Sequence, residues 1–269
     1  MKRQKCCAVL ITLFGLSFHT SIFAADIMDG LVGYWPFDAG EGDVAHDLVG
    51  GHDGSIKRAA WTDRAKSGKW ALQFSPEEDT KIVVPDAEAL DNLPDGHTVT
   101  NWIWPVSRGA MMDKSGGNHL RIQWFFFDDG RLHWGSGPNF AFSENPVSFR
   151  KWSHVAWSHS AELSVVYVNG EIFHEELNMG APMPTGEPMI FGRSGIIAAG
   201  NPKQQNFEGI MDDFGFWNRP LSEKEISEVF EKGIGTILAV SHRGKTTMTW
   251  AAVKVHNLQS LSGANLSKN

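Results

Sequence analysis

Short runs of alternating apolar and polar residues recur along most of the chain, and they predict a protein built of β-strands. Residues 119–124 alternate in this way, so their three apolar side chains would lie on one face of a strand. Residues 163–168 and 171–173 are two further runs, separated by Asn169-Gly170. Asn-Gly is a strong hairpin signal because both turn residues must adopt positive φ. The pattern indicates an all-β fold of short antiparallel strands.

One helix is expected near the carboxyl end. Ser222 and Glu225 have the spacing of a capping box, in which each residue satisfies a backbone N–H of the other. Three apolar residues then share one helical face and a glycine ends the helix: Ile226, Val229, Phe230 and Gly233. The chain becomes more polar afterwards, so we expect an appended tail over residues 235–269.

The first residues predict a secretory signal peptide. A basic start is followed by an apolar run from Cys6 to Leu16 and by small residues ending at Ala24. The run is shorter than the roughly 20 residues that span a bilayer. We therefore expect residues 1–24 to be removed and the mature protein to be secreted, whether extracellular, at the cell surface or in the periplasm, without membrane insertion. Both cysteines, Cys6 and Cys7, lie in this segment, so no disulfide is expected.

The charge narrows the range of partners. The chain has 24 Lys and Arg against 31 Asp and Glu, a formal net charge of −7. The charged residues of the predicted signal peptide are all basic, so its removal would make the net charge more negative. An acidic surface disfavours nucleic acid and anionic lipid as ligands. It is compatible with neutral ligands and with cations.

A series of sequence blocks over residues 30–232 resembles the LamG-like jelly-roll domain of secreted bacterial proteins, within the concanavalin A-like lectin/glucanase superfamily. The blocks occur in the family's order: Leu31–Asp38, Asp47–Gly54, Lys69–Phe74, Thr98–Pro105, Trp152–Ala156, Phe207–Asp213 and Trp217–Ser222. The resemblance implies a single antiparallel β-sandwich with jelly-roll topology over residues 25–234, with one short C-terminal helix.

The resemblance also implies a structural calcium ion in many relatives. Asp213 is the best candidate ligand and Asp47 the next, with Asp38, Asp53 and Asp212 as further candidates. These acids flank the first and last strands, which can be neighbours in a jelly roll, and Ca²⁺ prefers carboxylate and carbonyl oxygens. The alternative is that each aspartate only caps a turn.

Eleven tryptophans offer rings for stacking on sugars. By strand parity Val99, Asn101 and Ile103 face the core, which buries Asn101, and Trp102 and Trp104 lie on the opposite face. Trp104 is the best candidate for an exposed ring. Trp102, Arg121 and Trp134 are the other candidate ligand contacts, whereas Trp35, Trp152 and Trp157 are expected in the core.

No catalytic pattern stands out. Glucanases of this fold carry paired carboxylates on one strand in a Glu-x-Asp-x-x-Glu pattern, and this chain has none. The sequence therefore favours an extracellular recognition module for carbohydrate. A protein–protein adhesion or scaffold module that binds an extracellular protein is one alternative. A glycan-processing hydrolase with an unrecognised site is the other.

Overall fold

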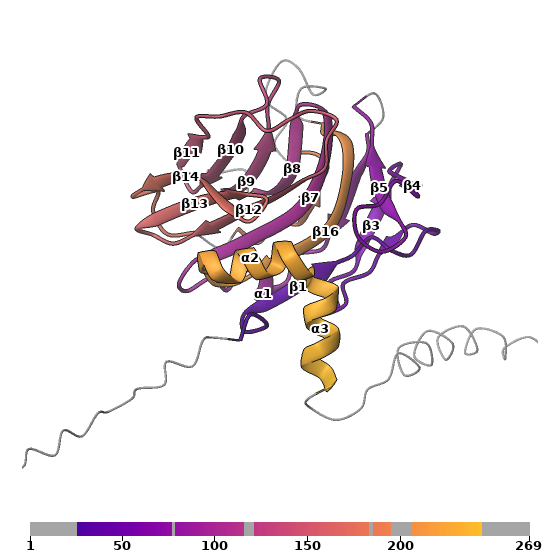
Figure 1. Cartoon of the computed structure of the whole chain (residues 1–269), viewed down its shortest axis with the longest axis horizontal. Coiled ribbons are helices and arrows are strands. Elements are labelled where there is room, and N and C mark those ends of the chain that lie inside the picture. Colours follow the sequence, from indigo (N-terminus) through magenta and orange to yellow (C-terminus); the bar gives the residue numbers. More distant parts are fainter. Residues whose placement is uncertain (1–25, 77–78, 116–120, 183–184, 195–205, 244–269) are drawn as a thin grey trace, which may run out of the picture.

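The computed structural model describes residues 26–76, 79–115, 121–182, 185–194 and 206–243. The expected signal peptide and most of the expected tail lie outside these residues. Two antiparallel sheets of eight strands each pack face to face in a β-sandwich, as Figure 1 shows. Within the described chain, no helix is long and apolar enough to cross a membrane.

Sheet A follows the order β14-β13-β12-β7-β16-β5-β4, and β1 pairs with β16 beside this path. Its longest strands, β7 and β16, lie side by side at the centre, and β16 contains a bulge between Asp212 and Gly215. The strands are β1 (Leu31–Trp35), β4 (Ala60–Thr62), β5 (Ala71–Phe74), β7 (His97–Ser107), β12 (Ser153–His159), β13 (Leu163–Val168), β14 (Glu171–Leu177) and β16 (Glu208–Trp217).

Sheet B follows the order β11-β10-β9-β8-β15-β6-β3-β2. Among the described strands, β11 is therefore an edge strand that pairs with β10 alone. The strands are β2 (Val44–Ala45), β3 (Gly54–Lys57), β6 (Lys81–Val84), β8 (Gly109–Ser115), β9 (Arg121–Phe126), β10 (Leu132–Ser136), β11 (Asn139–Phe142) and β15 (Met189–Phe191).

The main core lies between the two sheets and confirms the expected register of β7. Val99 and Ile103 are fully buried there, and so is Asn101. The Nε1–H of Trp124 donates to Oδ1 of Asn101 over 3.2 Å, which gives the buried amide oxygen its partner. The Nδ2 group of Asn101 is buried without a partner among the described residues, and an unpaired buried polar group costs about 1–3 kcal/mol. Trp35 and Trp157 are fully buried, as expected.

A second core lies on the outer face of sheet A, under the helices. Helix α2 (Glu223–Lys232) begins with the predicted capping box, and its buried Ile226 and Val229 pack with Ala156 and Tyr167 of sheet A. Figure 1 shows α2 lying across this sheet. Helix α3 (Ile234–Arg243) continues beyond it and buries Ile237, so the first residues of the expected tail belong to the fold. A third helix, α1 (Glu88–Asp91), is a single turn.

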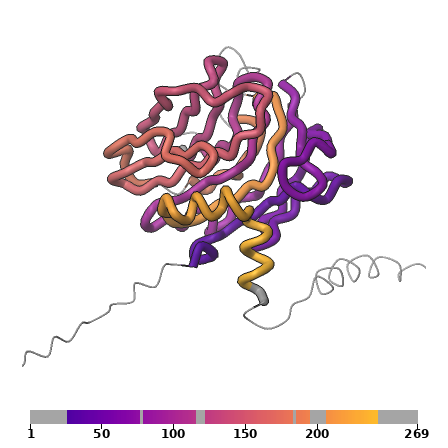
Figure 2. The backbone as a smooth tube through the Cα atoms, in the orientation of Figure 1, coloured from indigo at the N-terminus to yellow at the C-terminus, as the bar shows by residue number. Residues whose placement is uncertain are grey.

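The first and last strands of the fold pair with each other in sheet A. Strand β1 runs antiparallel to β16, with Tyr34 opposite Gly215 and Trp35 opposite Phe214. The indigo and orange traces lie side by side in Figure 2. This pairing brings the loops after β1 close to the acidic segment of β16.

Candidate functional site

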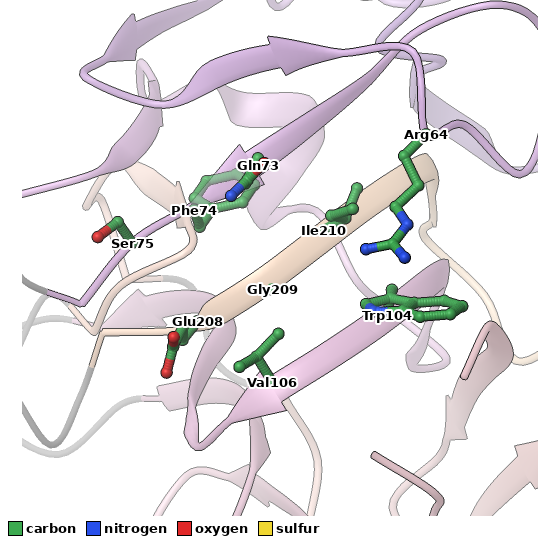
Figure 3. Close-up of a pocket in the computed structure, with 9 residues that line it drawn as sticks. All are labelled: Arg64, Gln73, Phe74, Ser75, Trp104, Val106, Glu208, Gly209 and Ile210. Carbon is green, nitrogen blue, oxygen red and sulfur yellow. The ribbon is translucent and has the colours of Figure 1, made fainter. Parts of the chain in front are cut away.

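A solvent-open cavity of about 130 Å³ lies on the outer face of sheet A, beside the area that the helices cover. Three neighbouring strands supply its floor, because Gln73 of β5 pairs with Ile210 of β16, which in turn pairs with Trp104 of β7. Glu208, Ser75 and Val106 extend the lining, and Arg64 reaches it from the loop after β4, as Figure 3 shows.

Trp104 provides the aromatic wall of this cavity. Its ring is half-buried, and the Cζ atom of Arg64 lies 4.3 Å from the ring centroid. The ring of Trp152 meets that of Trp104 edge to face, with centroids 6.1 Å apart. Trp152, expected in the core, is half-buried beside it. Trp104 is thus partly accessible to solvent, and its contact with a ligand stays a prediction.

The loop between β4 and β5 lies over this face because two aspartates hold its backbone. Oδ2 of Asp212 accepts the N–H groups of Lys66 and Ser67 over 2.8 and 2.9 Å. Oδ1 of Asp38 accepts the N–H groups of Lys69 and Trp70 over 2.7 and 3.0 Å. The anchored loop carries Arg64 over Trp104 and Lys66 over Trp102. The Lys66 Nζ atom lies 4.5 Å from the Trp102 ring centroid.

Trp102 lies on the same face as Trp104, as predicted, but it is largely covered. Its ring packs against His154 and against Phe230 of helix α2, with centroids 5.2 and 5.7 Å apart, and only 9% of the residue is exposed. Trp102 therefore joins the helix to the sheet. It was predicted to contact the ligand directly, and the structure instead shows it as a packing residue.

Trp134 is also a correction. It is fully buried, and its Nε1–H donates to the sulfur of Met179 over 3.2 Å. Strand parity explains this, because Trp134 shares the inward face of β10 with Leu132, which is also fully buried. Arg121 begins β9, and its side chain lies outside the described part of the structure.

The aspartates predicted as calcium ligands fall into two sets. In the first set, Asp47 and Asp53 hold the loop after β2. The Asp47 carboxylate accepts the N–H groups of Tyr34, Val49, Gly50 and His52. Asp53 accepts the N–H of Asp47 and contacts Nδ1 of His46. These two carboxylates stabilise turns, which is the alternative that the sequence left open.

The second set is buried between the loop and β16. Asp212 has a second oxygen, Oδ1, that is buried without a partner among the described residues. Burial, with Asp213 and Asp38 nearby, raises the pKa of Asp212 to about 8. Asp213 accepts the hydroxyl of Tyr34, and burial raises the pKa of Asp213 to about 6. Burial and Asp213 together raise the pKa of Tyr34 as well.

The described residues test how well a calcium ion would fit. No three His, Cys, Asp or Glu side chains in this part of the chain gather as closely as metal ligands do. The five candidate acids therefore do not form one such group among the described residues, and whether calcium binds stays a prediction. Asp212 and Asp213 remain compatible with a cation, because Oδ1 of Asp212 is a buried carboxylate oxygen without a partner and Ca²⁺ also accepts carbonyl and water oxygens.

Sequence reasoning did not single out Gln73 and Glu208 as site residues. The sequence signal that could have found Gln73 is the alternation of side chains along β5. Gln73 is an exposed polar residue between the buried residues Leu72 and Phe74. Parity places a residue on a face, but it does not show which strands are neighbours. The cavity is formed by β5, β16 and β7 together, and these are distant in the sequence.

The fold has many known counterparts. The binding domain of Paraclostridial mosquitocidal protein 1 is 18% identical, with a TM-score of 0.60, covering 76% of this chain and 52% of that chain. The chain thus spans about half the length of that domain. Domain 4 of AbnA, an extracellular GH43 arabinanase from Geobacillus stearothermophilus, is 18% identical with a TM-score of 0.58, covering 75% of this chain and 98% of that chain.

Botulinum neurotoxin type C is 14% identical over 77% of this chain and 52% of its own, with a TM-score of 0.57. At these identities the likeness shows the fold alone. A comparison with curated protein sequences found no match.

The family profile described as the concanavalin A-like lectin/glucanases superfamily matches residues 76–227, which is more than half of the sequence. The chain belongs to this superfamily.

Proposed function

We propose that this protein is an extracellular recognition module that binds a neutral glycan in the cavity on the outer face of sheet A. The proposal rests mainly on one solvent-open cavity, which is lined by Trp104, Arg64, Gln73 and Glu208. The Trp104 ring offers the part of its apolar surface that Arg64 and Trp152 leave uncovered to the C–H groups of a sugar. The guanidinium and amide donate hydrogen bonds to hydroxyl groups, and the carboxylate accepts them.

The balance of charges at the cavity supports a neutral ligand. Arg64 is the cation of the lining and Glu208 its carboxylate. An acidic sugar would gain from Arg64 but would be repelled by Glu208. Among the described residues of the lining, Glu208 is the single carboxylate, whereas a retaining glycosidase needs two carboxyl groups about 5 Å apart, and this supports binding rather than hydrolysis.

Proteins of similar fold support the ligand class. The AbnA domain forms a complex with arabinotriose, and cell entry of botulinum neurotoxin type C depends on interaction with two ganglioside molecules. These ligands are not transferred to this chain. They support the proposal that a protein of this fold can bind a saccharide.

A glycan array tests the proposal. The wild-type protein should bind a subset of neutral glycans, and Trp104→Ala should lose the signal on the same spots. Leu177→Ala is the matched control, because it removes an exposed apolar side chain from β14, at the end of sheet A away from the cavity. An array without signal for the wild type would refute the proposal. Equal binding by wild type and Trp104→Ala would show that glycans bind at another site.

Secretion and calcium are further parts of the proposal. Residues 1–24 carry the pattern of a signal peptide, so the amino-terminal sequence of the mature protein should begin at Ala25.

Asp212 and Asp213 would hold a structural calcium ion beside the β4–β5 loop. There the ion would supply charge neutralisation for buried carboxylates, and it would stabilise the loop that carries Arg64.

A further inference from the structure

The floor of the cavity on the outer face of sheet A is a small grid of side chains, because three neighbouring segments each contribute two residues to it. In the first row, Ile210 of β16 lies between its partners Gln73 of β5 and Trp104 of β7. The second row lies two residues away in each segment and consists of Ser75, Glu208 and Val106, as Figure 3 shows. Neighbouring strands are about 5 Å apart, and two residues along a strand span about 7 Å.

The polar side chains of this grid are free to meet a ligand. Within the described chain, no hydrogen bond or ion pair engages the carboxylate of Glu208, the amide of Gln73 or the hydroxyl of Ser75. An ionised carboxylate only accepts hydrogen bonds, whereas an amide group both donates and accepts them. A ligand that binds here must therefore present a donor to Glu208, and it can present an acceptor to Gln73.

An apolar strip lies beside Glu208. Ile210 is buried, with 4% of the residue exposed, and Val106 is half-buried. A sugar hydroxyl held against this strip would lose water without gaining a hydrogen bond, which is unfavourable. A methyl group in the same place would bury apolar surface, which is favourable. The ligand should therefore carry a hydrogen-bond donor and a small apolar group close together.

An acetamido group combines these features without a charge. Its N–H donates, its carbonyl oxygen accepts, and its methyl group is apolar. A protonated amine would also donate to Glu208, but it would be repelled by Arg64, whose Cζ atom lies 4.3 Å from the Trp104 ring centroid in the same cavity. The charges of the cavity therefore favour the neutral amide over the amine.

We propose that the glycan bound in this cavity carries an N-acetylated amino sugar. The acetamido N–H would donate to Glu208, the carbonyl oxygen would accept from the Gln73 amide, and the methyl group would lie against Ile210 and Val106. This inference rests on the proposed glycan function and adds the chemical class of the sugar to it.

An array of matched sugars tests the inference. Its spots present N-acetylglucosamine and N-acetylgalactosamine, the parent sugars glucose and galactose, and the free amines glucosamine and galactosamine, all on one linker. The wild-type protein is applied over a range of concentrations. It should bind the acetamido spots at least about tenfold more tightly than both counterparts, because one lacks the methyl contact and the other carries a positive charge.

Two substitutions in the second row probe the two contacts of the acetamido group. Val106→Ser removes the apolar contact, so the ratio of acetamido to parent-sugar affinity should fall towards one. This ratio is insensitive to a loss of folded protein, which lowers both signals alike. Glu208→Ala should weaken binding to the acetamido spots about tenfold. Glu171→Ala is its matched control, because Glu171 is an exposed carboxylate on β14, at the far end of sheet A, and should leave binding unchanged.

The outcomes separate this inference from the glycan site itself. Equal affinity for acetamido and parent spots, tighter binding of the free amines, or an unchanged ratio in Val106→Ser would overturn the acetamido inference. If that binding is still lost in Trp104→Ala, the glycan site stands without it. Binding to other glycans but to no acetamido spot would overturn it in the same way. A wild type that binds no glycan at all would remove the site and the inference together.

Discussion

At the cavity on the outer face of sheet A, the indole ring of Trp104 contacts both the Arg64 guanidinium and the ring of Trp152. Two residues earlier on β7, the ring of Trp102 lies under helix α2 and is largely covered. The two tryptophans share a face, and their roles differ because the helix reaches one and not the other. A pair of substitutions separates binding from packing.

Trp102→Ala should lower the free energy of unfolding by about 3–5 kcal/mol, because it leaves a cavity between the sheet and helix α2. Trp104→Ala should cost markedly less, since its ring is half-buried, while it weakens glycan binding. Urea denaturation of both variants measures the difference. An equal loss of stability would show that Trp104 is a packing residue like Trp102.

Buried histidines set the acid limit of stability. Burial lowers the pKa of His154 to about 3, with the ring packed against Trp102 and Phe230. Burial also lowers the pKa of His159 to about 4. Their folded-state pKa lies below the unfolded value of about 6.5, so the unfolded chain binds more protons between these limits. Stability should therefore fall as the pH drops from about 6.5 towards 4.

His154→Phe should reduce this loss of unfolding free energy by roughly 1–2 kcal/mol at pH 5, because Phe keeps the ring contacts but has no group to protonate. Nδ1 of His154 has no partner in the described chain, so the substitution loses no hydrogen bond there. The raised pKa of Asp212 acts in the opposite direction, so the comparison must be made between variant and wild type. Parallel stability curves of the two proteins against pH would contradict the role of His154.

At the scale of elements, the loop between β4 and β5 decides the shape of the glycan site. Asp212→Ala removes the acceptor of the Lys66 and Ser67 N–H groups, which should exchange with solvent faster and let Arg64 move away from Trp104. Asp212→Asn keeps one oxygen and should have a smaller effect. Amide exchange of these two residues measures the change. Unchanged amide exchange in Asp212→Ala would show that Asp212 does not hold the backbone of the loop.

Local elements could be predicted from sequence where a short signal determines the backbone. Asn169 and Gly170 both have positive φ, as their hairpin requires, and Ser222 caps α2 as predicted. Parity also predicted that Asn101 is buried and that Trp104 lies on the outer face. Trp134 was misplaced because the inward face of its strand depends on which sheet lies opposite. The cavity could not be predicted, because β5, β16 and β7 meet only after the whole sandwich forms.

At the scale of the molecule, the sandwich separates two surfaces. The cavity proposed for a glycan lies on the outer face of sheet A, and a cluster of rings around His133 lies on the outer face of sheet B.

Calcium is tested on the whole molecule. If the ion occupies the space beside Asp212 and Asp213, EDTA should lower the melting temperature by several degrees and added Ca²⁺ should restore it. Asp212→Asn should lose most of this response, whereas Asp53→Asn should keep it, because Asp53 holds the turn after β2. A melting temperature unaffected by EDTA would remove calcium from the account.

The central claim is that a glycan contacts the outer face of sheet A at Trp104. Its most direct test is a titration of ¹⁵N-labelled protein with a glycan identified on the array, followed through the tryptophan indole N–H signals. The Trp104 signal, assigned by its absence in Trp104→Phe, should shift with increasing glycan, and the signal of fully buried Trp134 should stay in place. Shifts that leave Trp104 unchanged and gather on other residues would contradict the account.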